Sequence, residues 1–298
     1  MKAASFDYAR ASDLEHALAL LNQHGFDAKL IAGGQSLVPM MAMRLVRPAV
    51  LVDIHRLPAL RQRRIEAQQV RTGAAVRQRE LEDDAGLLAA LPLLRAALAW
   101  VGHTQTRNRG TVGGSLAHAD PAAELPLAAA VLGATLHLRS QGAERGVAAA
   151  DFFQGAMATA LHETEVLVEI DWPRWEGPGV HSAFDEVAMR QGDFAMASAA
   201  CQLQIDAAGV CRRAALGIGA LDGAPRVFPA LSAQLIGQRI DARLARDVAQ
   251  AAAAQTEPGS DLHADADYRR ELGAVLMVRV LMQASAAATA APTGAATP

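Results

Sequence analysis

The apolar positions of the first 55 residues follow first a helical period and then the short runs that are typical of buried strands. Leucine and alanine fall at helical spacing from Leu14 to Leu21, after a capping box that begins at Ser12, and Gly25 is placed to end the helix. The runs "AKLIAGG" and "AVLVDI" are predicted to form two strands, with a short helix in "PMMAMRLVRP" between them. These elements predict a small β-α-β-type unit.

The middle of the chain is predicted to combine strands with helices rich in alanine and leucine. The segments "QVRTGAAV", "ATLHLRS" and "EVLVEIDWP" have the pattern of strands. Leu87 to Val101 is predicted to be one helix with an internal proline, and Pro121 to Gly133 a helix with proline at its first position. We place a domain boundary in the stretch rich in proline and glycine from Pro173 to Gly179.

The C-terminal part begins with a predicted hairpin and continues with helices. The segments "ASAACQLQID" and "VCRRAALGIGAL" are predicted to be strands joined by the turn "DAAG". Helices rich in alanine are expected near 241–255 and 264–287, and the low-complexity residues 287–298 are expected to be disordered. No period of about 20 to 50 residues recurs, which argues against a solenoid.

Composition narrows the class of protein. The 298 residues suggest two domains, and the 51% of apolar residues can supply a sizeable core. A net charge of −3 argues against nucleic acid as the main partner. The N-terminus lacks the apolar region of a signal peptide, and no uninterrupted apolar run reaches the roughly 18 residues of a membrane span. With only Cys201 and Cys211, we expect free thiols in a reducing cytoplasm and no iron–sulfur cluster on this chain.

Two glycine segments are the strongest candidate chemistry: Ala32 to Ser36, "AGGQS", and Thr111 to Ser115, "TVGGS". Glycine lets backbone approach a ligand closely, and consecutive N–H groups in such a turn bind anions. Each segment could hold one phosphoryl group of a diphosphate, so together they favour a dinucleotide-like ligand. The alternative is that each is only a tight turn. Neither has the spacing of a P-loop or of a Rossmann fingerprint.

Three segments resemble the flavin subunit of the molybdenum hydroxylases: "AGGQSLVPMMAMRL", "RNRGTVGGSLAHADPAAELP" and "MRQGDFAMASAA". The resemblance extends from Phe6 to about Gln283. It implies an α+β chain with a two-subdomain FAD-binding fold of the vanillyl-alcohol-oxidase-like type, followed by a smaller α/β C-terminal domain. The implied boundaries are 1–177 for the FAD-binding domain, with subdomains of about 1–56 and 57–177, then 180–286 for the C-terminal domain and 287–298 for the disordered tail.

The same resemblance implies which residues bind the cofactor. In this family the two glycine segments bind the FAD diphosphate, an acidic residue contacts FAD, and an apolar residue lies beside the isoalloxazine ring. The implied FAD-binding residues are Leu30, Ile31, Ala32, Gly33, Gly34, Gln35, Ser36, Leu37, Thr111, Val112, Gly113, Gly114, Ser115, Asp120, Glu124 and Leu167. Asp185 aligns with a family position that is often lysine. No His or Cys lies in an attachment motif, so FAD is expected to be held non-covalently.

Other polar residues near the second glycine segment have two interpretations. His118 is either a proton carrier beside the flavin, since histidine titrates near neutral pH, or a residue that only orders its own loop. Arg107 and Arg109 either pair with a phosphate or an acidic partner protein, or are solvated. No His, Cys or Asp cluster has the spacing of metal ligands, and no side chain is predicted to act as nucleophile or general base.

The resemblance implies the FAD subunit of a multi-subunit molybdenum hydroxylase, an oxidoreductase subunit of the cytoplasm. Electrons would come from iron–sulfur clusters on a small partner subunit and leave through FAD to an acceptor such as NAD or a quinone. The molybdenum cofactor and the organic substrate would belong to a large partner subunit, in a dimer of heterotrimers. Two alternatives stay open: a stand-alone FAD-dependent oxidoreductase, and a non-enzymatic assembly module that uses the glycine turns only structurally.

Overall fold

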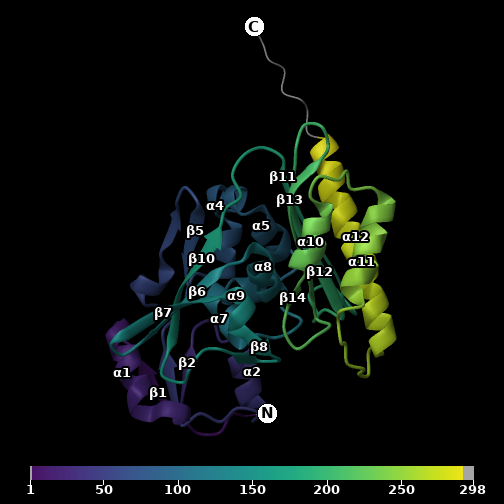
Figure 1. Cartoon of the computed structure of the whole chain (residues 1–298). Helices are drawn as coiled ribbons and strands as arrows, with labels where there is room; N and C mark the ends of the chain where they lie inside the picture. The colour runs from purple at the N-terminus through teal and green to yellow at the C-terminus, as the bar shows by residue number, and fades with distance from the viewer. Residues whose placement is uncertain (1, 291–298) are drawn as a thin grey trace. The chain divides into compact units, whose positions relative to one another are not determined.

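The computed structural model describes residues 2–290, which form two compact units (Figure 1). Both units mix helices with strands, as expected for the α+β class. The first unit consists of residues 2–90, Val101–Asp120 and Gly133–Arg174. The second consists of Leu91–Trp100, Pro121–Leu132 and residues 175–290, so it takes in two stretches from the middle of the sequence.

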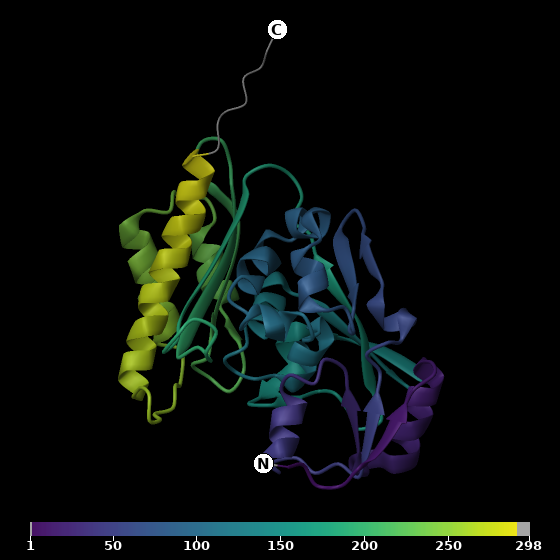
Figure 2. The ribbon, with the colours of Figure 1, turned by 180° about the vertical axis from the view of Figure 1, so that it is seen from behind.

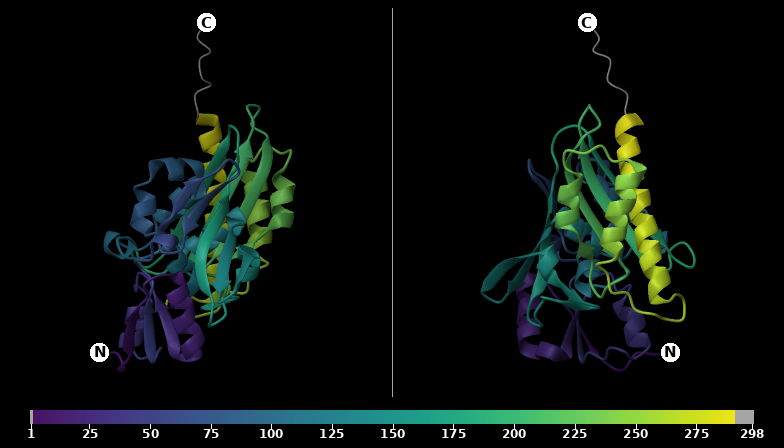
Figure 3. Two further views of the ribbon diagram at one scale, coloured as in Figure 1. Left: turned by 90° about the vertical axis from the view of Figure 1, so that its left-hand side faces the viewer. Right: turned by 45° about the vertical axis from the view of Figure 1, so that its right-hand side comes forward.

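The first unit begins with a parallel sheet of three strands in the order β1-β3-β2 (Figure 3). These strands confirm the predicted β-α-β-type unit, in which a short helix connects β2 to β3. Its elements are β1 (Asp7–Arg10), α1 (Leu14–His24), η1 (Gly25–Asp27), β2 (Ala28–Ile31), α2 (Leu37–Ala42) and β3 (Val50–Asp53). The apolar face of α1 is buried as the periodicity predicted, through Leu14, Ala17, Leu18 and Leu21.

The ends of α1 show how local chemistry sets its length. The N-cap is Asp13, whose carboxylate accepts a hydrogen bond from the His16 N–H at 2.8 Å, so the prediction that the cap begins at Ser12 was wrong by one residue. Ser12 instead hydrogen-bonds the Asp13 carboxylate. Gly25 ends the helix as predicted, with a φ of 50° that few other residues adopt.

A five-stranded antiparallel sheet in the order β4-β5-β10-β6-β7 forms the rest of the first unit's framework. Its strands are β4 (Arg63–Ile65), β5 (Gln69–Gly73), β6 (Thr135–Ser140), β7 (Ala143–Ala148) and β10 (Val166–Pro173). The smaller elements are η2 (Pro58–Arg61), α3 (Gln78–Glu82), α4 (Ala85–Ala90), α6 (Thr104–Arg107), α7 (Val112–His118), α9 (Ala149–Phe152), β8 (Phe153–Gly155) and β9 (Ala158–Thr159). The buried Trp172 indole donates to the Thr72 hydroxyl at 2.8 Å, which joins β10 to β5.

The second unit is built on an antiparallel sheet in the order β11-β12-β13-β14. Its elements are α5 (Pro92–Leu98), α8 (Glu124–Leu132), β11 (Val180–Val187), β12 (Ala197–Ile205), β13 (Cys211–Gly219), β14 (Arg226–Val227), α10 (Pro229–Leu235), α11 (Ala242–Ala253) and α12 (Ala266–Ala290). Strands β12 and β13 confirm the predicted hairpin. Helices α11 and α12 lie side by side along the sheet (Figure 2).

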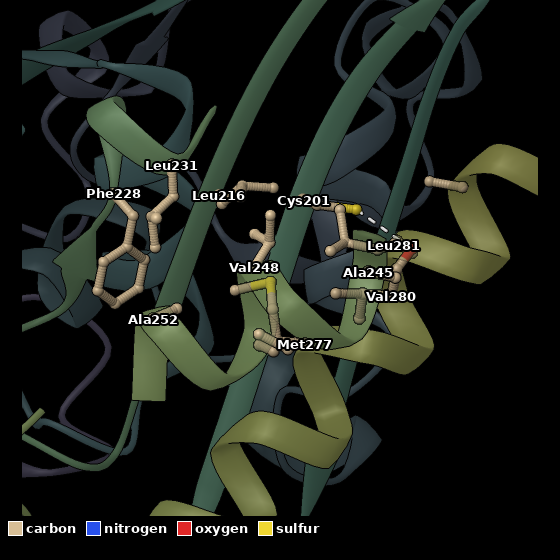
Figure 4. Close-up of a cluster of buried hydrophobic side chains, with 14 of the residues drawn as sticks. Cys201, Leu216, Phe228, Leu231, Ala245, Val248, Ala252, Met277, Val280 and Leu281 are labelled. Atoms are coloured by element: carbon tan, nitrogen blue, oxygen red, sulfur yellow. Dashed lines mark hydrogen bonds between the residues drawn. The ribbon is translucent and has the colours of Figure 1, made fainter. Parts of the chain in front are cut away.

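Apolar side chains from α10, α11, α12 and the sheet meet in one buried core (Figure 4). Leu216, Val248 and Met277 belong to this core, and the Cys201 thiol donates to the Val280 carbonyl at 3.2 Å. Both cysteines are free and buried. Burial raises the pKa of Cys201 to about 12, so its thiol stays protonated and packs as a small apolar group.

Three predicted helices differ from those in the structure. Leu87 to Val101 is two helices, α4 and α5, because Pro92 cannot donate a backbone hydrogen bond and so opens a new helix. Helix α8 begins at Glu124 instead of Pro121, since the Pro121 carbonyl accepts from the Ala220 N–H at 2.9 Å. Helix α12 continues to Ala290, so the predicted tail begins too early, and residues 291–298 lie outside the described residues. Between residues 2 and 290, no helix is long and apolar enough to span a bilayer.

Candidate functional site

A pocket of about 510 Å³ lies within the first unit, where β2 and β3 end. The carboxyl ends of neighbouring parallel strands are the usual place for a ligand in open α/β sheets. The pocket is lined by parts of both glycine segments and by polar residues from β1, from β3 and from the loop after β5. Its residues are Tyr8, Ile31, Ala32, Gly33, Gly34, Gln35, Val38, Pro39, Asp53, His55, Ala75, Arg77, Arg109 and Thr111.

The first glycine segment turns sharply after β2 and leaves its backbone donors free. Gly34 has a φ of 71°, which allows the chain to turn from Ile31 into α2. Within the described residues, the N–H groups of Gly33, Gly34, Gln35 and Ser36 make no hydrogen bond. Consecutive free N–H groups at a pocket wall form a site for an anion. The chemistry of this donor set therefore fits a phosphoryl group.

The second glycine segment is the first turn of α7, and its donors are almost all used inside the protein. Thr111 is the N-cap and its hydroxyl accepts from the Gly114 N–H at 3.1 Å. Val112 and Gly113 donate to the carbonyls of Val76 and Ala74, each at 2.9 Å. A Cβ on Gly113 would lie 2.7 Å from the Ala74 Cα, so this glycine allows two backbone segments to pack closely. The expectation of a turn whose N–H groups face a ligand does not hold for these residues.

The two glycine segments nevertheless meet in space. A Cβ on Gly33 would lie 2.9 Å from the Gly110 Cα and would also overlap the Arg109 carbonyl. The antiparallel bridge between Arg77 and Thr111 holds this second segment in place, with the Gln78 N–H on the Gly110 carbonyl at 2.9 Å. The fold thus brings Ile31 to Gln35 and Thr111 to one pocket, as expected if both serve one ligand.

A hydrogen-bonded group supports the other end of the pocket. The buried Asp53 carboxylate accepts from the Tyr8 hydroxyl, from the His55 N–H at 3.0 Å and from His55 Nδ1 at 2.7 Å. Burial acts to raise the pKa of Asp53, but the hydrogen bonds from Tyr8 and His55 outweigh it and hold that pKa below its usual value. The hydrogen bond to Asp53 in turn raises the pKa of Tyr8. Asp53 is therefore ionised at neutral pH and orients two residues that line the pocket.

Sequence reasoning missed Tyr8, Asp53, His55 and Arg77. A signal for two of them was present, since "DIH" follows one buried strand as "AGG" follows its neighbour. The carboxyl ends of adjacent parallel strands come together at one edge of a sheet, so both turns face the same space. Arg77 gave no local signal, because only the bridge to Thr111 brings it to the pocket.

The two arginines of "RNR" have different environments. Arg107 is held by the Glu82 carboxylate, with Nε at 3.1 Å, and by the carbonyls of Val101 and Gly102. This bonding supports neither interpretation that the sequence suggested, because Arg107 serves the loop itself. Arg109 lines the pocket.

The remaining candidates lie outside the pocket lining. In the first unit, Leu30 is in β2, Ser36 and Leu37 are at the start of α2, Val112 to Ser115 are in α7, and Leu167 is buried in β10. His118 Nε2 lies 4.0 Å from the Asp120 carboxylate, a contact within its own loop. Residues 2–290 contain no group of three or more His, Cys, Asp or Glu side chains placed to hold a metal ion.

Glu124 begins α8 in the second unit and lies near another buried acid. Glu186 of β11 is only 6% exposed, and its Oε2 has no hydrogen-bond partner among the described residues. Burial first, and then the charges of Glu124 and Asp185, raise the pKa of Glu186 to about 8. Glu186 therefore carries a proton at neutral pH. Asp185 itself forms an ion pair with Arg279 at 3.6 Å.

Comparison with protein families assigns the class. Residues 4–175 match the FAD binding domain in molybdopterin dehydrogenase, and residues 182–284 match the CO dehydrogenase flavoprotein C-terminal domain. The first match alone spans more than half of the chain. The chain therefore belongs to the family of FAD-binding medium subunits of molybdenum hydroxylases and is an oxidoreductase subunit.

Individual relatives cover nearly the whole chain. The 6-hydroxypseudooxynicotine dehydrogenase complex subunit alpha of Paenarthrobacter nicotinovorans is 39% identical, over 95% of this chain and 96% of the relative. The carbon monoxide dehydrogenase medium chain of Hydrogenophaga pseudoflava is 35% identical, over 93% and 96%. The crystal structure of quinoline 2-oxidoreductase from Pseudomonas putida 86 superposes with a TM-score of 0.91 at 38% identity, over 97% of this chain and 99% of that chain.

Proposed function

We propose that the pocket of the first unit binds the diphosphate of FAD without a covalent bond. The observation that carries this proposal is the run of free N–H groups from Gly33 to Ser36, of which Gly33, Gly34 and Gln35 line the pocket. The membership of residues 4–175 in an FAD-binding family supports it. Ile31 to Gln35 and Thr111 line this pocket, which supports their assignment to FAD. For all the candidates named from the sequence, contact with FAD stays a prediction.

We further propose that this subunit relays electrons from iron–sulfur clusters on a small partner subunit to an acceptor such as NAD or a quinone. FAD, when bound, supplies the ability to accept electrons singly and to pass them on as a pair. The chain's own residues hold and orient the cofactor, which is the protein's usual share in cofactor chemistry. The names of relatives as subunits or medium chains support partner subunits. The match to the FAD binding domain in molybdopterin dehydrogenase supports a partner that carries molybdenum. A dimer of heterotrimers in the cytoplasm completes this proposal.

Binding of FAD is tested on the purified chain. The protein is precipitated with acid, and the flavin is measured in the supernatant and in the pellet. We expect FAD in the supernatant, and the apo-protein should quench the fluorescence of added FAD. Flavin that stays in the pellet would contradict non-covalent binding, and a colourless protein that does not quench FAD would favour the non-enzymatic assembly module.

The relay is tested by isolating the native complex through a tag on this chain. We expect two further polypeptides to co-purify, one with iron–sulfur clusters and one with molybdenum. The flavin should be reduced only when both of these polypeptides are present. A chain that oxidises an organic substrate when expressed alone with FAD would favour the stand-alone oxidoreductase and overturn the relay.

A further inference from the structure

The arginines of the first unit are paired with protein groups almost without exception. Arg71 pairs with Asp171, Arg79 with Asp83 and Arg145 with Glu165. Others donate to carbonyl oxygens or to a histidine ring, as Arg47 does to the Arg44 carbonyl at 3.1 Å. In the part of this unit that the structure describes, only the side chains of Arg77 and Arg109 have neither an ion pair nor a hydrogen bond. Both line the same pocket.

The backbone fixes both residues at that pocket while leaving their side chains free. Arg77 lies opposite Thr111 in the antiparallel bridge, and its own N–H donates to the Glu80 carboxylate at 3.0 Å. Arg109 lies two residues before Thr111, and its carbonyl lies directly against Gly33. Neither residue can leave the pocket wall without breaking these backbone contacts, so the fold keeps both guanidinium groups within reach of a ligand in the pocket.

The charge of the pocket is unbalanced. Asp53 is the sole carboxylate among the lining residues, and its oxygens already accept from Tyr8 and His55. The free N–H groups of Gly33 to Ser36 are neutral donors that orient an anion but add no full positive charge. A guanidinium binds a phosphoryl group through two parallel hydrogen bonds as well as by its charge. Two unpaired guanidinium groups beside these donors therefore suit a ligand with two negative charges.

We propose that Arg77 and Arg109 are binding residues that neutralise the two phosphoryl groups of the FAD diphosphate. The inference rests on the proposed function, because it concerns the same pocket. The N–H groups of the first glycine segment orient the diphosphate, and the two arginines supply its counter-charge. The affinity for FAD then falls as salt rises, since salt screens the charges of this half-open site.

The test uses Arg77→Gln, Arg109→Gln and the double variant, with Arg47→Gln as a matched control outside the pocket. FAD affinity is measured by fluorescence quenching of the apo-proteins at low and high salt. Each single change is expected to weaken FAD binding about tenfold, and the double change about a hundredfold, as for the loss of one and two charge-assisted hydrogen bonds. The double variant should also lose most of the salt dependence. Lysine at both positions should restore part of the affinity, and Arg47→Gln should bind as the wild type does.

Inorganic pyrophosphate separates this inference from the proposed function. Its binding to the wild-type apo-protein is measured by calorimetry and should disappear in the double variant, while the thermal melt of the apo-protein stays unchanged. Wild-type affinity or wild-type salt dependence for FAD in the double variant would overturn the inference and leave the FAD site intact. Failure of the wild type to bind FAD, with pyrophosphate bound through both arginines, would overturn FAD as the ligand but leave Arg77 and Arg109 as the groups that bind a diphosphate in this pocket. Failure to bind either would overturn both.

Discussion

The two glycine segments have nearly the same residues and opposite surroundings. After β2, Gly34 adopts a positive φ and the N–H groups from Gly33 to Ser36 stay free in the described structure. At the start of α7, the N–H groups from Val112 to Ser115 are bonded to protein oxygens. Glycine thus serves two purposes in one chain. In the first segment it leaves backbone donors free beside the pocket, and in the second it lets backbone pack against backbone.

This difference changes how the family motif is interpreted. A motif shows that glycine is needed at a position, but glycine is needed both for close ligands and for close packing. Gly113 packs on Ala74, and this contact supports the wall on which Arg109 and Thr111 lie. The second segment therefore acts on the pocket mainly by holding that wall. Substitutions that separate stability from FAD affinity can test this assignment.

The largest effect is expected for Gly113→Ala. The new Cβ would lie 2.7 Å from the Ala74 Cα, a backbone atom that cannot rotate away. Overpacking of this kind should lower the free energy of unfolding of the apo-protein by roughly 3 kcal/mol. Urea denaturation of the apo-protein measures it. An unchanged unfolding midpoint together with lost FAD binding would show that Gly113 faces the cofactor and would remove the distinction between the segments.

Gly34→Ala is expected to act mainly on the ligand. Alanine at a φ of 71° is strained by about 1–2 kcal/mol, and relief of that strain turns the neighbouring N–H groups away from the pocket. FAD affinity should fall about tenfold to thirtyfold, which corresponds to about 1.4–2 kcal/mol. Fluorescence titration of the apo-protein measures the affinity, and its thermal melt supplies the control. A lower melting temperature with unchanged affinity would place Gly34 among the packing glycines.

Asp53→Asn tests the support behind the first segment. Loss of the charged acceptor for Tyr8 and His55 should cost about 1.5 kcal/mol of unfolding free energy at neutral pH. The folded-state pKa of Asp53 lies below its ordinary value of 3.8, so its carboxylate stabilises the protein above that pH and the contribution is lost as pH falls below it. Unfolding measured from pH 3 to 7 should show a shallower acid dependence in the variant.

Glu186 provides an internal control for that pH series. The pKa of Glu186 is raised from 4.5 to about 8 in the folded protein. The free energy of unfolding should therefore fall as pH rises from 4.5 to 8, because over this range Glu186 is ionised in the unfolded chain but still protonated in the folded protein. The contribution of Glu186 to stability thus falls with rising pH, whereas that of Asp53 rises. Asp53→Asn should leave the contribution of Glu186 unchanged if the two groups act independently. An acid dependence equal to that of the wild type would contradict the role assigned to Asp53.

The smallest effect is expected for Thr111→Val. Valine keeps the shape but removes the hydroxyl that accepts from Gly114, and loss of such an N-cap costs about 1 kcal/mol. The unfolding free energy of the apo-protein should fall by that amount, while FAD affinity should change less than about threefold. A tenfold loss of affinity at unchanged stability would mean that the hydroxyl binds the cofactor and that the second segment is also a ligand site.

Local sequence determined most of the elements. Apolar periodicity placed α1, β2, β3 and the hairpin of β12 and β13, because the spacing of apolar residues within an element determines which face it buries. Errors occurred where one residue competes with the pattern, as when Pro92 divides a predicted helix in two. The local pattern also could not predict how the chain divides into units, because α5 and α8 come from the middle of the sequence but belong to the unit of the C-terminal sheet.

The sequence by itself also identified the family and the two glycine segments, because both depend on residue types in a fixed order. Only the tertiary structure decided which backbone donors are free. Whether an N–H group is free depends on which carbonyl the fold brings alongside it. Ala74 and Val76, which accept from α7, lie in the loop after β5, more than 30 residues earlier in the sequence. The same holds for Arg77 and Arg109. The sequence shows that both residues are charged. Only the packing of the fold decides that no partner within the described chain lies beside their side chains.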